Sequence, residues 1–252
     1  MSESPAGIGG QTARLPFPPV VLGITGASGS GKTTLAVELA RTLGGIHFPL
    51  DHYYRDLSHL PFEERVLHNF DDPRLIESLL LAAQVAALAQ GKAIERPIYD
   101  FSTYIRVPGK TEPVSAGAFL IVEGLFALYY PELLPLYQLR IYVDTPDEVC
   151  FERRLKRDME QRGRSEASVR LQYDATVRPS SLRYVRPSEQ KPTSRSMARK
   201  PWIGRSNRCW LRCVNVGCCA RQAEAQSVGS CSENRVSAFS ITPSDRPMRQ
   251  RW

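Results

Sequence analysis

Residues 26–34 read GASGSGKTT and match the phosphate-binding loop pattern of Gly, any four residues, Gly, Lys and Ser or Thr. An apolar run at residues 20–24 precedes the loop, and apolar residues at helical spacing follow it from Leu35 to Leu43. The mechanism of such a loop requires a strand before it and a helix after it, because the N-terminus of the helix points N–H groups at phosphate oxygens. The sequence therefore predicts an α/β fold that binds phosphate, rather than an ordinary glycine-rich turn.

The residues of this loop have different expected contacts with a nucleotide. The glycines allow the backbone to curl around phosphate oxygens. We expect Lys32 to reach the β- and γ-phosphates and Thr33 to offer its hydroxyl to Mg²⁺. The predicted nucleotide-binding residues are Gly26, Ala27, Ser28, Gly29, Ser30, Gly31, Lys32, Thr33 and Thr34.

The net charge of +7 is unevenly distributed over the 252 residues. Residues 1–190 carry 21 Lys and Arg against 23 Asp and Glu, whereas residues 191–252 carry 12 against 3. The second segment holds five of the six Cys, and only 8 of its 62 residues are Leu, Ile, Val or Phe, too few for a core. We expect a flexible leader over 1–18, one domain over 19–190, and a disordered basic, Cys- and Arg-rich tail over 191–252, for which a shifted reading frame is a better explanation than divergence.

Composition also bears on location and partners. No stretch approaches 18 consecutive apolar residues, and the N-terminus lacks a basic segment followed by an apolar one, so we expect a cytoplasmic protein without a membrane partner. The tail cysteines lack paired CxxC spacing, which favours free thiols over a zinc site. Nucleic-acid binding by the basic tail is a weaker alternative, because no recognition motif accompanies the charge.

Three further segments, mostly apolar, predict strands that end in carboxylates. Residues 46–50 lead to Asp51, residues 118–122 lead to Glu123, and residues 139–143 lead to Asp144. Because the carboxyl ends of parallel strands line the ligand crevice of such a sheet, these carboxylates are expected beside the phosphate loop.

The remaining segments predict helices and a hairpin. Asp72 and Pro73 predict the start of an Ala- and Leu-rich helix that Gly91 closes. Residues 97–114 predict a hairpin, and residues 146–177 predict an arginine-rich helical pair. The fold class is therefore a three-layer P-loop NTPase domain with a mostly parallel sheet, a small β-hairpin insertion and an Arg-rich helical lid.

Phosphoryl transfer requires charge neutralisation, in-line geometry and a group that polarises the incoming oxygen. Asp51 or Glu123 could accept the proton of the acceptor hydroxyl or hold Mg²⁺ through water. Arginines of the lid could clamp phosphate oxygens, although a solvated face with ion pairs to acidic neighbours such as Asp158 is the alternative. Aromatic residues clustered over 48–104 could stack a planar base.

The sequence resembles a known family, the uridine kinases within the phosphoribulokinase/uridine kinase group of P-loop kinases. The matching segments run in family order from residue 20 to about 190 and read GITGASGSGKTT, LDHYYRD, EERVLHNFDDP, RPIYDF, IVEGLFAL, YVDTPDEVCFERRLKRDMEQRGRS and VRLQYDATVRP. The resemblance implies transfer of the γ-phosphate of ATP or GTP, with Mg²⁺, to the 5′-hydroxyl of uridine or cytidine in pyrimidine salvage. It also implies a homotetramer.

The resemblance assigns roles by position. Asp51 corresponds to the general base, and Lys32, Arg157 and Arg162 correspond to groups that act on the phosphates. Thr33 and Glu123 correspond to the residues that organise Mg²⁺. The implied nucleoside-binding residues are Tyr54, Asp71, Tyr99, Tyr104, Arg154, Arg164 and Gln172.

Two departures from the family qualify these expectations. Tyr104 stands where the family commonly has a His that reads the pyrimidine, and a phenol differs from an imidazole in reach and shape. After residue 190 the sequences of the family continue with a final strand and helix. The sequence of this chain after residue 190 does not resemble that segment. A related kinase with another acceptor, similar to phosphoribulokinase or pantothenate kinase, and a nucleotide-binding protein without turnover therefore remain as alternatives.

Overall fold

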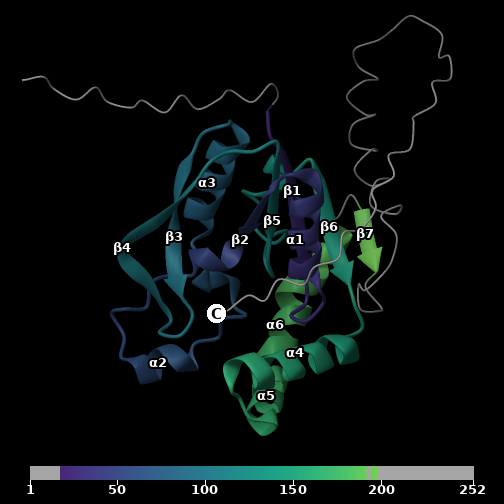
Figure 1. The fold of residues 1–252 in the computed structure, drawn as a ribbon. Helices are drawn as coiled ribbons and strands as arrows, with labels where there is room; N and C mark the ends of the chain where they lie inside the picture. Colours follow the sequence, from purple (N-terminus) through teal and green to yellow (C-terminus); the bar gives the residue numbers. More distant parts are fainter. Residues whose placement is uncertain (1–17, 192–193, 198–252) are drawn as a thin grey trace, which may run out of the picture.

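The computed structural model describes residues 18–191 and 194–197. A parallel sheet forms the centre of the fold, with strand order β2-β5-β1-β6-β7 (Figure 1). Its strands are β1 (Val20–Gly26), β2 (Ile46–Pro49), β5 (Phe119–Glu123), β6 (Leu139–Asp144) and β7 (Ser194–Met197). Every pairing in this sheet is parallel, and the central strand β1 lies between β5 and β6.

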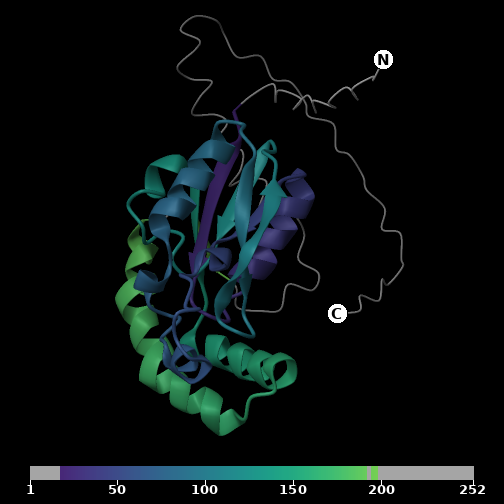
Figure 2. The same cartoon turned by 90° about the vertical axis from the view of Figure 1, so that its left-hand side faces the viewer.

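Helices cover both faces of the sheet (Figure 2). On one face, α1 (Lys32–Leu43) packs Leu35 and Leu39 into a cluster with Leu22 and Ile24 of β1. On the other face, Val21 belongs to a larger cluster that includes apolar residues of α3 (Ser78–Ala89) and of the C-terminal helical segment. Successive residues of β1 thus point to opposite faces, which produces the predicted three layers.

Two smaller parts flank the sheet: in Figure 1 one lies to the left of β2 and the other lies below α1. One is the antiparallel hairpin of β3 (Ile94–Asp100) and β4 (Ile105–Val114), with α2 (Phe62–Leu67) nearby. The other is the arginine-rich lid, which consists of α4 (Asp147–Arg162) and α5 (Glu166–Gln172).

The segment after α5 departs from regular α-helix. Two π-helical turns, Tyr173–Val177 and Ser181–Val185, flank α6 (Arg178–Ser180), and a 3₁₀ turn over Arg186–Gln190 follows. Proline lacks the N–H that an α-helix needs, so Pro179 interrupts the regular bonding pattern here. Three further 3₁₀ turns lie in the domain, at Leu50–Tyr53, Pro73–Leu75 and Leu134–Leu136.

The predicted start of the Ala- and Leu-rich helix was wrong. The Asp72 side chain accepts a hydrogen bond from the Arg74 backbone N–H, so it caps only the 3₁₀ turn Pro73–Leu75. The chain then passes through an extended Ile76, and α3 begins at Ser78. Ile76 is buried and forms a bridge with Tyr54, which explains why the chain straightens before α3.

The sheet continues past the boundary that composition predicted at residue 190. We expected no strand in the tail, but the backbone of β7 pairs in parallel with β6, from Ile141↔Ser194 to Asp144↔Met197. The leader at 1–17, the tail at 198–252 and the tail cysteines lie outside the described residues. Across the described segments, none of the helices has the length and apolar character required to cross a bilayer.

Candidate functional site

The phosphate loop follows β1 and leads directly into α1, as the motif requires. Gly31 has a left-handed backbone, with φ 93°, and stands at the N-cap of α1, so the helix begins at Lys32. The Ser30 N–H donates to the Ala27 carbonyl at 3.0 Å, which closes the turn. Thr145, which follows β6, donates to the Ser30 carbonyl at 3.0 Å. The loop is therefore shaped by its own turn and fixed from the neighbouring strand end.

Thr33 and Glu123, the two residues predicted to organise Mg²⁺, lie in contact, and His47 binds the same carboxylate. The Thr33 hydroxyl donates to Oε2 of Glu123 at 3.2 Å, and His47 Nε2 lies 3.3 Å from Oε1 of the same carboxylate. Glu123 ends β5 and is 4% exposed. No cluster of three or more His, Cys, Asp or Glu with metal-binding geometry occurs in the described residues. Mg²⁺ commonly takes one or two protein oxygens, phosphates and water, so a hydroxyl beside a buried carboxylate fits this ion.

Glu123→Gln is expected to raise the Mg²⁺ concentration needed for half-maximal activity by about 10- to 100-fold, the usual cost of losing an outer-shell partner. The amide keeps the shape of the side chain but removes the charge that attracts the ion. A magnesium titration at fixed nucleotide measures this effect. Glu132→Gln, an exposed change outside the site, serves as the control, and an equal magnesium requirement in both variants would contradict the assignment.

Asp51 lies in the 3₁₀ turn that directly follows β2, beside the phosphate loop. Desolvation in the site and the nearby Glu123 carboxylate raise its pKa to about 6, against the opposing effect of Lys32. A carboxylate whose pKa is raised toward neutrality is a stronger proton acceptor than an ordinary aspartate, and it is still ionised at pH 7.

The predicted acceptor residues gather on the hairpin side of Asp51. Asp71 is buried, and desolvation raises its pKa although Arg154 and Lys32 oppose the shift. Tyr54 donates its hydroxyl to the Phe70 carbonyl at 2.9 Å. Tyr99 is buried, and its enclosed hydroxyl has no hydrogen-bond partner within the described chain.

Tyr104 has a backbone that is unusual for a bulky residue, with φ 57°. Its ring stacks on Phe70 with a centroid distance of 5.0 Å and an interplanar angle of 28°. Strained backbone of this kind tends to occur at functional sites, because the surroundings must hold it. The neighbouring Arg106 instead serves the scaffold, donating to the Tyr54 carbonyl at 3.0 Å and pairing with Glu77 at 3.0 Å.

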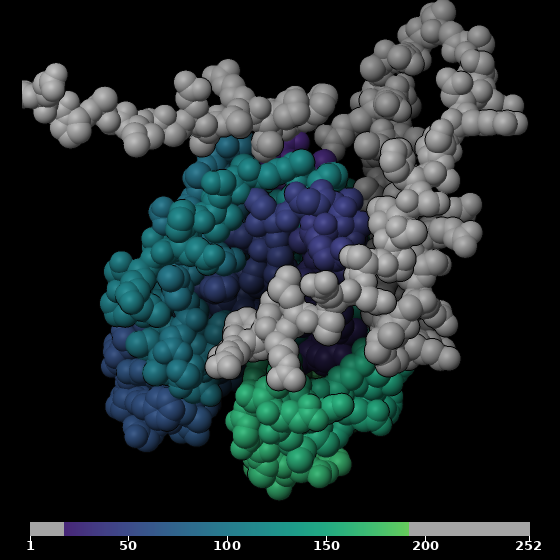
Figure 3. All heavy atoms as spheres, viewed as in Figure 1, coloured from purple at the N-terminus to yellow at the C-terminus, as the bar shows by residue number. Residues whose placement is uncertain are grey.

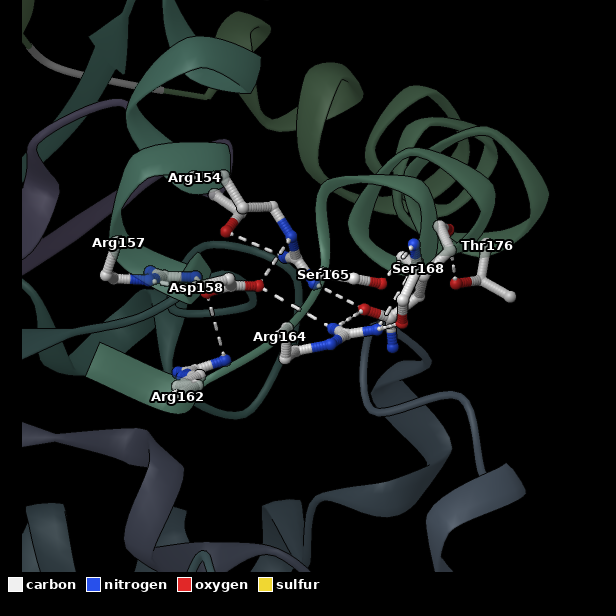
Figure 4. Close-up of polar contacts among 10 residues, drawn as sticks. Arg154, Arg157, Asp158, Arg162, Arg164, Ser165, Ser168 and Thr176 are labelled. Carbon is white, nitrogen blue, oxygen red and sulfur yellow. Dashed lines mark hydrogen bonds and ion pairs between the residues drawn. The ribbon is translucent and has the colours of Figure 1, made fainter. Parts of the chain in front are cut away.

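The lid brings together the remaining predicted residues. Arg154 is buried and donates to Ser28 Oγ of the phosphate loop at 2.9 Å and to Gln172 Oε1 at 3.1 Å. Arg164 donates to the same Gln172 oxygen at 2.5 Å. Arg157 and Arg162 contact Asp158, around which all four guanidinium groups converge (Figure 4). Arg154 thus links the lid to the phosphate loop.

The molecular surface is hollowed between these two groups of residues. Figure 3 shows the hollow between the surface of α2 with the hairpin and the surface of α4 with α5. Asp71 and Tyr99 come from the first side, and the lid arginines come from the second.

Two residues of this site were not assigned by the sequence analysis. His47 was read only as part of a strand, yet it contacts Glu123 from the adjacent strand. Asp158 was considered only as a partner for surface ion pairs, but it is fully buried. The partner of His47 comes from a distant part of the chain, and the burial of Asp158 is not visible in the local charge pattern.

Comparisons with known proteins give consistent results. The sequence model of the phosphoribulokinase / uridine kinase family matches residues 21–194. The chain is 42% identical over 175 residues to a uridine kinase of Chloroflexus aurantiacus, covering 68% of this chain and 83% of that protein. A uridine kinase of Alkaliphilus metalliredigens is also 42% identical over 175 residues, covering 68% and 84% of the two chains.

Solved structures show the same fold. Phosphoribulokinase from Rhodobacter spheroides superposes with a TM-score of 0.52 at 14% identity, covering 75% of each chain. A structure from Bacillus stearothermophilus, titled as a possible uridine kinase, gives a TM-score of 0.50 at 20% identity and covers 73% of this chain and 91% of that one. The predicted α/β fold of a P-loop kinase is confirmed.

Proposed function

The chain belongs to the phosphoribulokinase / uridine kinase family, and we propose that it transfers the γ-phosphate of ATP or GTP to the 5′-hydroxyl of uridine or cytidine. Relatives named uridine kinase, 42% identical over most of the domain, support this acceptor over those of phosphoribulokinase or pantothenate kinase. The products would be UMP or CMP and the nucleoside diphosphate.

The observation that carries this proposal is the environment of Asp51. Its carboxylate is close enough to Lys32 of the phosphate loop and to Asp71 on the acceptor side for both charges to affect its pKa. A base with a pKa of about 6 suits an alcohol acceptor, which must lose its proton as the phosphoryl group arrives. Water-dependent hydrolysis would not require the ordered aromatic and carboxylate groups on the hairpin side.

The other side chains have complementary roles in this proposal. Lys32 and the loop N–H groups would hold the donor phosphates, and Thr33 with Glu123 would hold Mg²⁺, which neutralises phosphate charge when bound. Asp71 and Arg154 would bind the ribose hydroxyls, and Tyr54, Tyr99, Tyr104, Arg164 and Gln172 would surround the nucleoside. Arg157 and Arg162 would stabilise the charge that develops on the transferred group.

The direct test is a phosphorylation assay of the full chain with Mg-ATP or Mg-GTP and a panel of acceptors. We expect UMP or CMP to form, and ribulose 5-phosphate and pantothenate to remain unphosphorylated. Thermal melting with and without Mg-ATP distinguishes a folded nucleotide-binding protein from one that does not fold. Stabilisation by the nucleotide without turnover of any nucleoside would contradict the proposal.

The pH dependence should follow the ionisation of Asp51. Because the base acts when deprotonated, kcat/KM is expected to fall about tenfold for each pH unit below an apparent pKa near 6, and to level off above it. Arg162 lowers the pKa of Asp51, so Arg162→Gln should move this acid limb to higher pH. Lys156→Gln removes the same charge from the exposed side of α4 and should leave the limb in place. Equal profiles for the three proteins would argue against Asp51 as the titrating group.

A further inference from the structure

A buried carboxylate that the roles above do not use lies inside the lid. Asp158 is on α4 and its side chain is 0% exposed. Arg157 donates to Oδ1 through Nη2 at 2.8 Å and Nε at 3.0 Å, and Arg162 Nη1 lies 3.4 Å from the same oxygen. Nη1 of Arg164 and Nε of Arg154 lie 3.7 and 3.6 Å from Oδ2. Figure 4 shows the carboxylate at the centre of the four arginines.

The charges of this cluster do not balance. Asp158 is the one carboxylate of the described residues in ion-pair contact with these four guanidinium groups. Two other lid carboxylates have partners elsewhere: Glu160 pairs with Lys156 and Glu166 pairs with Arg170. The surplus positive charge lies on Arg157 and Arg162, which are partly exposed, so it is open to an incoming anion. Such a surplus suits a polyanion, such as the phosphates of a nucleotide.

The four arginines differ in how firmly they are held. Arg154 and Arg164 are also bound by Gln172, so they are fixed from two sides. Arg157 and Arg162 are 34% and 55% exposed, and the hydrogen bonds and ion pairs found for them in the described chain are with Asp158. Asp158 therefore sets the position of the two arginines that remain free to reach an additional anion.

These two arginines also lie near enough to Asp51 and Asp71 for their charges to act on both carboxyls. Arg162 influences the pKa of Asp51, and Arg157 influences that of Asp71. Both effects lower the pKa of the carboxyl, which requires the guanidinium charge to lie near it. The positive charges that Asp158 holds therefore lie within electrostatic reach of the proposed base and of Asp71.

We infer that Asp158 is a positioning residue, which orients Arg157 and Arg162 so that they meet the transferred phosphoryl group. This inference rests on the proposed kinase function. Asp158 does not itself touch a substrate. It shares the arginines with the incoming phosphate, because a guanidinium group has five N–H donors and can bind a carboxylate and a phosphate oxygen at once. Preorganised donors of this kind act mainly in the transition state.

Asp158→Asn tests the inference. The amide retains the size of the side chain but loses the charge, so kcat is expected to fall about 30- to 100-fold, somewhat less than the loss of a direct transition-state donor. The dissociation constant for Mg-ADP should change less than about threefold, because the loop binds the diphosphate. Glu160→Gln, an exposed change on the same helix, should leave kcat unchanged. A kcat for Asp158→Asn within about threefold of the unaltered chain would overturn the inference, as would an increase.

A mutant cycle separates positioning from general stability. If Asp158 acts through the two arginines, Asp158→Asn should lower kcat by less than about threefold when it is added to an Arg157→Gln/Arg162→Gln background. The same loss in both backgrounds would overturn the inference. Asp158→Glu, which keeps the charge but displaces it, should recover part of the lost kcat. If neither Asp158 variant folds, as judged by thermal melting, Asp158 has a structural role and the inference is wrong.

The outcome of this experiment is distinguishable from failure of the proposed function. The unaltered chain is assayed first with uridine and cytidine. If it forms no monophosphate, the proposed function fails whatever the variants do. If it is active and Asp158→Asn is equally active, only the positioning role fails.

Discussion

Asp51→Asn is expected to lower kcat by about 10³-fold, within the range that a positioned general base contributes. The asparagine side chain is nearly the same size but accepts no proton at neutral pH. The carboxylate it replaces follows β2 directly, and its pKa of about 6 reflects desolvation and the nearby Glu123 charge. Removing one of two close carboxylates also relieves repulsion, so the binding of Mg-ATP should persist or strengthen.

Two measurements distinguish this expectation from a general defect. Single-turnover phosphorylation of uridine gives the chemical step, and nucleotide-dependent thermal stabilisation gives donor binding. Asp56→Asn changes an exposed carboxylate five residues further on, one that binds Ser58 and the Arg106 backbone N–H, and should keep kcat within about threefold. A rate for Asp51→Asn close to that of Asp56→Asn would remove Asp51 from the role of base.

Much of the site was predictable because parallel sheets place strand ends together. The phosphate loop lies after β1, and the carboxylates Asp51 and Glu123 follow strands β2 and β5 on the same side of the sheet. Segments of five mostly apolar residues were sufficient to locate those strands to within one or two positions. The roles of these residues stay predictions until the variants are measured.

Local sequence predicted the structure less well where tertiary packing determines the path of the chain. Asp72 and Pro73 have the pattern of a helix start, yet burial of Ile76 keeps the chain extended and delays α3 to Ser78. The strand β7 has no apolar alternation, and backbone pairing with β6 is what defines it. The proposals that residues 1–18 are a flexible leader and that residues after 190 derive from a shifted frame remain predictions.

In the lid, the spacing of charged residues alone did not predict which of them are buried. A run of arginines with acidic residues at i,i+4 spacing is typical of a solvated helix face, and Arg170 with Glu166 has that exposed form. Asp158 has the same spacing to Arg154 and Arg162 but is buried. Arg164 reaches it only because Gly163, with φ 60°, ends α4 and turns the chain back. The turn at Gly163 therefore adds an arginine to the cluster that the i,i+4 spacing does not predict.

Gly29→Ala is expected to lower the free energy of unfolding by about 2–4 kcal/mol and to abolish stabilisation by Mg-ATP. Two costs add at this position. The backbone is left-handed, with φ 85°, and a Cβ atom would overlap the backbone carbonyl oxygen of Cys150 in α4. Backbone cannot move aside as a flexible side chain can, so either the phosphate loop or the lid helix must shift. Both carry groups that the donor phosphates need.

Gly109→Ala in the β-hairpin is the matched control, because Gly109 also has a left-handed backbone, with φ 65°, but open space where its Cβ would lie. The Gly109→Ala variant should lose about 1 kcal/mol of the free energy of unfolding, which is the conformational cost alone, and should keep the full stabilisation by Mg-ATP. Thermal unfolding of both variants with and without Mg-ATP gives the comparison. Equal losses would mean that the close approach of α4 to the phosphate loop does not matter. A larger loss in Gly29→Ala, with no nucleotide response, would show that the spacing between Gly29 and Cys150 couples the lid helix to the loop.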